Sequence, residues 1–159
     1  MQEKEEKPDF VKWFSELNKS SGKVAGGKGA NLAEIYNLKI AVPPGFVVTA
    51  QAYDYFIKKA GIKEKIADLL STIDYEDTTQ LDETTGKIRK LILDSSFPKE
   101  MQEEIIDAYE ALDANGFDFE KGSALDILNK TSEPMFVAVR SSATAEDLAD
   151  ASFAGAQES

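Results

Sequence analysis

Three short apolar segments, far apart along the chain, set the architecture that this sequence can adopt. They are residues 10–17, 46–48 and 135–139. The last, with the sequence MFVAV, is the strongest candidate for a β-strand, whereas residues 10–17 also fit one helical turn, although we favour a strand. Because apolar residues recur at helical spacing between these segments, the order is strand, helix, strand, helical block and strand. That order predicts an α/β or α+β fold with a helical insertion.

The expected helices are marked by caps and turns as well as by apolar spacing. We expect helices over residues 30–38 and 50–60, the second with Thr49 as its N-cap and Gly61 just past its end. Between them, the VPPG sequence of residues 42–45 predicts a rigid extended turn, since proline restricts its own backbone and that of its predecessor. Three further apolar stripes predict three more helices, and they begin at Ile62, Leu81 and Met101.

Composition excludes several classes of function. The 159 residues correspond to one domain or part of a larger one, and 18 Lys and Arg against 29 Asp and Glu give a net charge of -11. This charge disfavours binding to nucleic acid or to an anionic membrane. No apolar run approaches the roughly 18 residues of a membrane span. The absence of cysteine excludes thiolate chemistry and fits a cytoplasmic protein. Residues 1–9 are charged, lack the apolar core of a signal peptide, and are expected to form a disordered tail.

The chain also contains no histidine, which removes the commonest general base. No residue of this chain can therefore carry a phosphate as phosphohistidine. We assign no catalytic residue to the chain.

Residues 18–29, which end in GKVAGGKG, are expected to form a loop and are the first candidate for binding. Glycines let backbone N–H groups surround an anion, a helix N-terminus adds a favourable dipole, and lysine adds positive charge. The segment nearly fits the P-loop pattern, but Gly29 stands where that pattern needs Ser or Thr to hold magnesium, so a true P-loop is disfavoured. Another Gly-rich phosphate loop, which would use Gly26, Gly27 and Lys28, and a solvated surface loop both remain open.

Residues 139–147, VRSSATAED, follow the strongest strand candidate and are the second candidate for binding. A strand would place Arg140 at its C-terminal end, where α/β sheets bind ligands, and the guanidinium fork matches phosphate oxygens. Hydroxyl and backbone N–H groups at the turn add donors, and the side chains are Ser141, Ser142 and Thr144. An anion site and an N-capping turn for a following helix are both compatible with this pattern.

Other polar and aromatic side chains have simpler explanations. The carboxylates of Glu146, Asp147 and Asp150 suit a solvated helix start, and the acidic residues 74–77 suit a loop. We therefore assign no metal ligand to the chain. Three aromatic residues that can stack a nucleobase are more simply explained by core packing, and they are Trp13, Tyr53 and Phe56.

Three blocks in order carry a resemblance to a known family. They are GGKGANLAEI at residues 26–35, VPPGFVVTAQAYDYF at 42–56 and VAVRSSATAEDLADASFAG at 137–155. Together they resemble the nucleotide-binding domain of phosphoenolpyruvate synthases, and pyruvate phosphate dikinases carry similar blocks. The helical stretch FPKEMQEEIIDAYEAL at residues 97–112 is similar to the same family. The likeness covers nearly the whole chain after the tail and is far more specific than one Gly-rich loop.

The resemblance implies an ATP-grasp-like lobe that binds ATP with Mg²⁺ and passes a phosphoryl group to a histidine on a separate domain. That histidine then phosphorylates pyruvate, so that ATP, pyruvate and water become AMP, phosphoenolpyruvate and phosphate. The family's phosphate-binding lysine falls on Lys28, and its phosphate-binding arginine falls on Arg140.

The resemblance also implies that residues 10–159 are the N-terminal part of the ATP-binding domain. Ala156 stands where the family has glutamine, and the sequence reaches Ser159 before the second lobe, the histidine domain and the pyruvate barrel. We expect such a fragment to be inactive alone, with the remaining domains of the parent enzyme as partners and with exposed surface that can form a homodimer. The alternatives are a pyruvate phosphate dikinase, a rifampicin phosphotransferase and a free-standing, non-catalytic interaction module.

Overall fold

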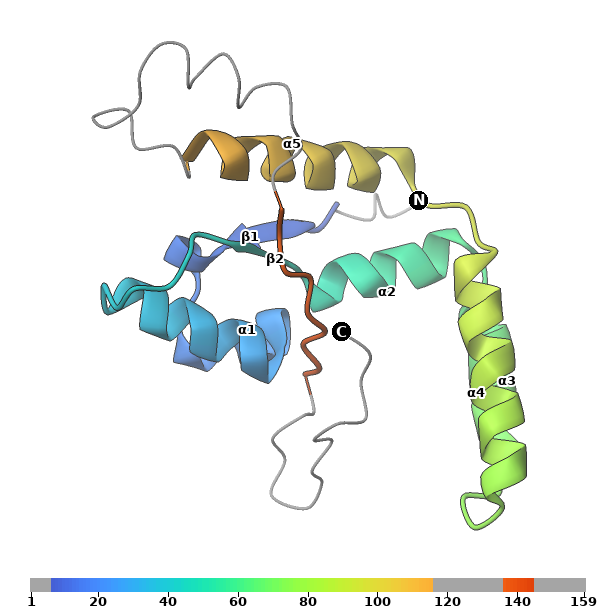
Figure 1. Cartoon of the computed structure of the whole chain (residues 1–159). Helices are drawn as coiled ribbons and strands as arrows, with labels where there is room; N and C mark the ends of the chain where they lie inside the picture. Colours follow the sequence, from blue (N-terminus) through green and yellow to red (C-terminus); the bar gives the residue numbers. More distant parts are fainter. Residues whose placement is uncertain (1–6, 116–135, 145–159) are drawn as a thin grey trace, which may run out of the picture.

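The computed structural model describes residues 7–115 and 136–144 (Figure 1). At its centre two short strands, β1 (Val11–Trp13) and β2 (Phe46–Val48), pair in antiparallel fashion. Helix α5 lies against β1, and α1 lies against β2 (Figure 1). The helices are α1 (Gly22–Asn37), α2 (Ala50–Lys59), α3 (Lys63–Ser71), α4 (Thr78–Leu93) and α5 (Lys99–Asn115). This mixed content confirms the predicted α+β class.

Two apolar clusters hold these elements together. The first packs the fully buried Phe10 against α2 and α5, and its other buried members are Ala52, Phe56, Ile57, Ile62 and Met101. The second joins the segment after β1 to α1, and its buried members are Phe14, Leu17, Ala25 and Ala33. Because burying a large apolar side chain stabilises a fold by about 1.5–3 kcal/mol, Phe10 is a strong anchor for β1.

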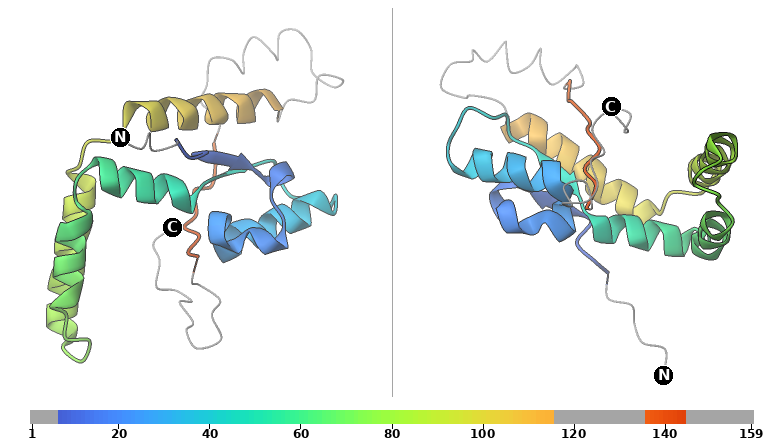
Figure 2. Two further views of the ribbon diagram at one scale, coloured as in Figure 1. Left: turned by 180° about the vertical axis from the view of Figure 1, so that it is seen from behind. Right: turned by 90° about the horizontal axis from the view of Figure 1, so that it is seen from below.

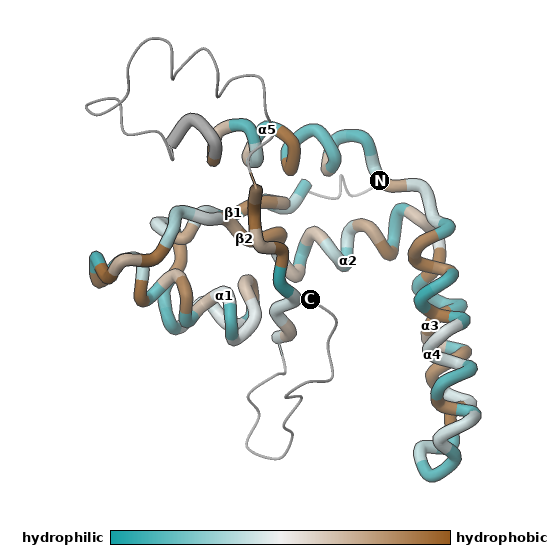
Figure 3. Tube along the Cα trace, in the orientation of Figure 1, coloured by the Kyte–Doolittle hydropathy of each residue, from teal (hydrophilic) through white to brown (hydrophobic). Residues whose placement is uncertain are grey.

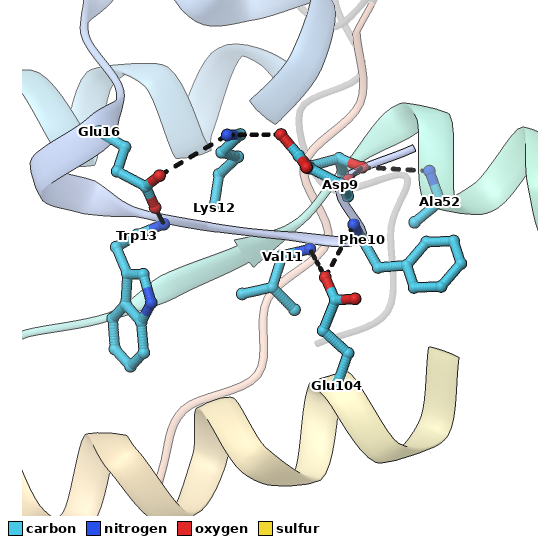
Figure 4. Close-up of polar contacts among 9 residues, drawn as sticks. Asp9, Phe10, Val11, Lys12, Trp13, Glu16, Ala52 and Glu104 are labelled. Atoms are coloured by element: carbon cyan, nitrogen blue, oxygen red, sulfur yellow. Dashed lines mark hydrogen bonds and ion pairs between the residues drawn. The ribbon is translucent and has the colours of Figure 1, made fainter. Parts of the chain in front are cut away.

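A carboxylate fastens α5 to β1 (Figure 4). Glu104 Oε1 accepts hydrogen bonds from the backbone N–H groups of Phe10 at 3.0 Å and Val11 at 3.1 Å. Its Oε2 pairs with Lys7 Nζ at 3.0 Å. Glu104 thereby supplies an acceptor for these two N–H groups at the start of β1. Without it, both donors would lack a hydrogen-bond partner within the described part of the protein.

Helices α3 and α4 form the helical insertion. They lie side by side and project away from the strands and from α1 (Figures 1 and 2). Polar and apolar residues alternate along both helices (Figure 3). Helix α3 has no fully buried residue, and α4 buries Thr84. The pair is therefore held by half-buried contacts rather than by a closed core.

Local sequence signals predicted the four helices after β2, whereas α1 begins at Gly22, eight residues before the predicted start at residue 30. Thr49 Oγ1 accepts a hydrogen bond from the Ala52 N–H at 3.1 Å, as expected of an N-cap. Gly61 follows α2 with a φ of 64°, a backbone conformation that favours glycine. The three later helices form at their predicted stripes, and residues 74–77 form the predicted loop between α3 and α4.

The first two strand predictions are only partly correct. Residues 10–17 form a strand over Val11–Trp13 and then a 3₁₀ turn over Phe14–Glu16. The reason is local, because Glu16 Oε2 accepts a hydrogen bond from the Trp13 N–H at 2.7 Å and closes a tight turn. Residues 46–48 do form a strand, but Val48 is 42% exposed rather than buried.

The segment with the strongest strand pattern is not a strand. Of residues 135–139, the structure describes 136–139, which are not part of the β1–β2 sheet. Phe136 is 98% exposed and Val139 is 80% exposed. An apolar run becomes a buried strand only when a neighbouring strand bonds to it, and no described residue does so here. The predicted strand is therefore wrong for residues 136–139.

Candidate functional site

A groove of about 600 Å³ opens between α1, the segment leading into β2, α5 and residues 136–142. Small-molecule sites commonly enclose about 300–1,000 Å³ and are mostly apolar with a few polar groups. The groove follows that pattern, since Leu32 of α1, Leu112 of α5 and the apolar residues of β2 line it. Its polar lining includes Lys28 and Arg140.

The two cations reach the groove from distant parts of the sequence. Lys28 lies on α1, and Arg140 lies on the segment 136–144. Lys28 and Arg140 are both exposed. A groove with apolar walls strengthens the attraction between its cations and an anionic ligand. In a chain with a net charge of -11, this pair is the feature of the groove that suits an anion.

Helix α1 is interrupted at Gly26. This residue has a φ of 70° and a ψ of 171°, a conformation that residues with a Cβ avoid. The helix therefore consists of a first turn from Gly22 and a longer part that ends at Asn37. The loop predicted for residues 18–29 is wrong, because they form a 3₁₀ turn at Lys19–Ser21 and the beginning of α1.

Residues from the far end of the chain cap this interruption. The Gly27 N–H donates to the Ala143 carbonyl at 3.1 Å. The Gly29 N–H donates to Ser142 Oγ at 2.9 Å, and the same hydroxyl donates to the Ala25 carbonyl at 2.6 Å. Two amide donors that the sequence offered to an anion are thus already bonded within the chain.

The glycines of α1 make room for this contact. A Cβ at Gly26 would lie 2.3 Å from Ser142 Oγ and 2.4 Å from the Ser142 carbonyl oxygen. A Cβ at Gly29 would lie 3.2 Å from both Ala25 Cβ and Val47 Cγ2. Close packing against α1 therefore accounts for two of the glycines in GGKG.

The predicted binding residues divide into two groups. The groove lining includes Lys28, Arg140, Ser141 and Ser142. It does not include Gly26, Gly27 or Thr144, and Thr144 is exposed at the end of the described segment. Ser142 Oγ accepts a hydrogen bond from the Gly29 N–H of α1, and the helix that the N-capping alternative requires lies outside the described residues. Glu146, Asp147, Asp150 and Ala156 lie outside the described residues.

The wall formed by residues 42–48 was missed in the sequence. The VPPG segment was assigned only to a turn, but it lines the groove together with β2. Gly45 lets it lie against Phe14, because a Cβ at Gly45 would lie 2.5 Å from Phe14 Cε2. The Phe14 N–H also donates to the Gly45 carbonyl at 3.0 Å. The available signal was the Pro-Pro-Gly sequence, which keeps the chain extended beside the 3₁₀ turn.

The aromatic residues set aside as core positions are not part of the groove lining. Phe56 is buried, as predicted. Trp13 is half-buried and lies edge-on to Phe46, with ring centroids 5.6 Å apart. Tyr53 is 53% exposed, so core packing is the wrong explanation for that residue.

Three carboxylates with lowered pKa values lie outside the groove, and a hydrogen bond to Lys12 lowers the pKa of the first, Asp9. The Tyr55 hydroxyl lowers the pKa of Glu100 by a hydrogen bond, and Lys58 does the same for the pKa of Asp54. Within residues 7–115 and 136–144, no group of three acidic, His or Cys side chains can hold a metal ion. No helix in that part of the chain is long and apolar enough to cross a membrane.

These features define a mixed α/β domain whose apolar groove presents two cations to a ligand. A sequence model of the family described as "Pyruvate phosphate dikinase, AMP/ATP-binding domain" matches residues 22–159. The chain belongs to this family. The match includes α1, every groove-lining residue except Phe14, and the segment that carries Arg140.

Curated relatives agree with the family match. The chain is 47% identical to a probable phosphoenolpyruvate synthase of Staphylothermus marinus over 149 residues, which is 94% of this chain and 16% of the relative. It is 44% identical to a probable phosphoenolpyruvate synthase of Methanocaldococcus jannaschii, covering 94% of this chain and 11% of the relative. It is 38% identical to the phosphoenolpyruvate synthase of Pyrococcus furiosus, covering 94% of this chain and 20% of the relative. The chain thus spans a fifth or less of the length of these relatives.

Proposed function

We propose that the groove binds the phosphate groups of ATP, and that the chain is the N-terminal nucleotide-binding portion of a phosphoenolpyruvate synthase. The observation that carries this proposal is the position of Lys28 and Arg140, which line the same groove although they lie at opposite ends of the chain. The family match and the names of the relatives support it.

The chemistry of phosphoryl transfer suits these two residues. Such catalysis consists almost entirely of positioning and of neutralising charge on the transferred group. Lys28 supplies a compact positive charge, and Arg140 supplies a planar fork of donors for phosphate oxygens. Ser141, which lines the groove beside Arg140, adds a hydroxyl. The apolar wall from Val42 to Val48 would receive the nucleoside.

The acceptor of the phosphoryl group has to lie outside this chain, because the chain contains no histidine. The proposed overall reaction converts ATP, pyruvate and water into AMP, phosphoenolpyruvate and phosphate in the cytoplasm, through a phosphohistidine on another domain. Mg²⁺ would accompany the ATP, but the described residues offer no cluster of ligands for it. Its ligands would therefore be the phosphates and groups outside residues 7–115 and 136–144.

The exposed apolar segment before Arg140 favours a second role in assembly. Phe136 and Val139 are almost completely exposed, and exposed apolar patches mark surfaces that associate. This surface suits either the remaining domains of the parent enzyme or a second copy of the chain. Analytical ultracentrifugation checks the homodimer, and a clean monomer at high concentration in both the parent and Phe136→Asp would rule it out.

Calorimetric titration of the chain with Mg-ATP tests the proposed function. Lys28→Ala and Arg140→Ala are each expected to weaken binding by about 1.5–3 kcal/mol, the usual contribution of a charged hydrogen bond. Lys87→Ala is the matched control, since Lys87 lies on α4, far from the groove. Unchanged affinity in both groove variants would refute the site. A loss of Mg-ATP affinity in the Lys87→Ala variant as well would indicate non-specific charge attraction.

A further inference from the structure

Three hydrogen bonds join residues 142–143 to α1 around Gly26. We infer that Ser142 is the positioning residue of the groove, because its hydroxyl clamps the Arg140 segment onto the interruption in α1 and so sets the separation of Lys28 and Arg140. The clamp rests on geometry alone. Its role in binding rests on the proposed function.

The bonding capacity of the hydroxyl fits a structural role. A serine hydroxyl has one proton to donate and two lone pairs to accept with. Ser142 donates to the Ala25 carbonyl at 2.6 Å and accepts from the Gly29 N–H at 2.9 Å. These two groups stand on either side of Gly26 in the same helix. Because its proton is already used, Ser142 is not a donor to phosphate, although it lines the groove.

The clamp acts on both cations through short stretches of chain. Lys28 directly precedes Gly29, and Arg140 lies two residues before Ser142. The bond from the Gly27 N–H to the Ala143 carbonyl adds a second contact, so that two consecutive residues are bonded to one helix. Burial holds the preceding residues only weakly, since Phe136 and Val139 are 98% and 80% exposed.

The conformation and the surroundings of Gly26 agree with this assignment. Any side chain at Gly26 would occupy the place of Ser142 Oγ, which lies 2.3 Å from an ideal Cβ there. The backbone at Gly26 also has a positive φ. The interruption at Gly26 therefore leaves the space that the Ser142 hydroxyl occupies, as expected of a defined contact between the two segments.

Amide hydrogen exchange, measured by NMR on the full chain, tests the clamp without any ligand. Ser142→Ala removes the hydroxyl and is expected to speed exchange at Gly29 roughly tenfold, because a half-buried donor loses its partner. Ser95→Ala is the matched control, since its hydroxyl donates to the Leu91 carbonyl at 2.7 Å elsewhere in the fold, and Gly29 exchange should be unchanged. Unchanged Gly29 exchange in Ser142→Ala would refute the clamp. If Ser142→Ala unfolds, Ser142→Thr keeps the hydroxyl and should protect Gly29, and fast exchange there would also refute it.

A spin label tests the positioning role, and the absence of native cysteine makes the labelling specific. A nitroxide on Asn31→Cys, at an exposed position of α1, should broaden the amide signals of residues 140–143. Adding Ser142→Ala should remove much of this broadening. Retained broadening would show that the hydroxyl does not hold the segment in place.

Titration with Mg-ATP separates this inference from the proposed function. The expected result is weaker binding by Ser142→Ala and restored binding by Ser142→Thr. If the parent binds Mg-ATP and Ser142→Ala binds it equally well, the positioning role is refuted while the proposed function stands. If the exchange and broadening results support the clamp but the parent does not bind Mg-ATP in the titration, the proposed function fails and the clamp stands.

Discussion

Gly26→Ala is expected to destabilise the fold strongly, for two reasons that the structure separates. The φ of 70° and ψ of 171° place Gly26 in a region that is nearly restricted to glycine, and such strain costs about 1–3 kcal/mol. The new methyl group would also lie 2.3 Å from Ser142 Oγ and 2.4 Å from the Ser142 carbonyl oxygen. Overpacking of this kind costs typically about 1–3 kcal/mol. Alanine reduces the entropy of the unfolded chain, which offsets about 0.4–1 kcal/mol.

The net loss in the free energy of unfolding is therefore about 2–5 kcal/mol, a large part of the roughly 5–15 kcal/mol of a typical domain. Urea unfolding followed by far-ultraviolet circular dichroism measures it as a lower midpoint at an unchanged slope. Gly86→Ala is the matched control, because Gly86 lies inside α4 with nothing within 4 Å of a new Cβ. That variant should gain about 0.5–1 kcal/mol. A Gly26→Ala midpoint at or above that of the parent would refute the close contact between Ser142 and α1.

Three further changes test other contacts. Glu104→Ala should lower the free energy of unfolding by about 1–3 kcal/mol, because two backbone donors lose their acceptor; Glu104→Gln keeps an acceptor oxygen and should lose less in the same urea assay. Tyr55→Phe removes the hydrogen bond that lowers the pKa of Glu100. A carboxylate with a lowered pKa in the folded state contributes stability above its ordinary pKa of 4.5, and that contribution is lost as the pH falls through the folded-state pKa. The urea midpoints of parent and Tyr55→Phe should therefore differ at pH 7 and converge below pH 4.5, and a constant difference across that range would contradict the assignment. Gly45→Ala should cost about 1–3 kcal/mol, because its Cβ would lie 2.5 Å from Phe14 Cε2; a neutral result would show that the Phe14 ring moves aside freely.

The parts of the fold that the sequence predicted are those decided within a few residues. Thr49 caps α2 through an N–H three residues away, and Gly61 ends the helix through its own backbone conformation. The exposed residues 136–139 show the limit of such signals. Their apolar pattern is that of a buried strand, but burial depends on what lies beside them in space, which no local pattern contains.

The candidate site shows the same limit more sharply. A Gly-rich segment that precedes a helix has one appearance, whether its glycines surround an anion or admit another segment of chain. The contacts of Gly27 with Ala143 and of Gly29 with Ser142, which lies 113 residues away, distinguish the two. The cations were identified from residue type and from the family resemblance, and the structure brings Lys28 and Arg140 to one groove. The apolar wall beside Phe14 was missed because its residues carry no polar chemistry.

The way α1 is capped bears on how this groove would hold a phosphate. In a P-loop, backbone amides supply most of the donors, and a lysine adds charge. Here the amides of Gly27 and Gly29 already bond to Ala143 and Ser142. The positive charge offered to a ligand therefore comes mainly from the side chains of Lys28 and Arg140, which are exposed. Contacts of exposed side chains are weakened by salt, so binding of Mg-ATP should weaken as ionic strength rises, and Lys28→Arg, which keeps the charge, should bind more tightly than Lys28→Ala. Equal binding by these two variants would mean that backbone amides, after displacing Ser142 and Ala143, hold the phosphates instead.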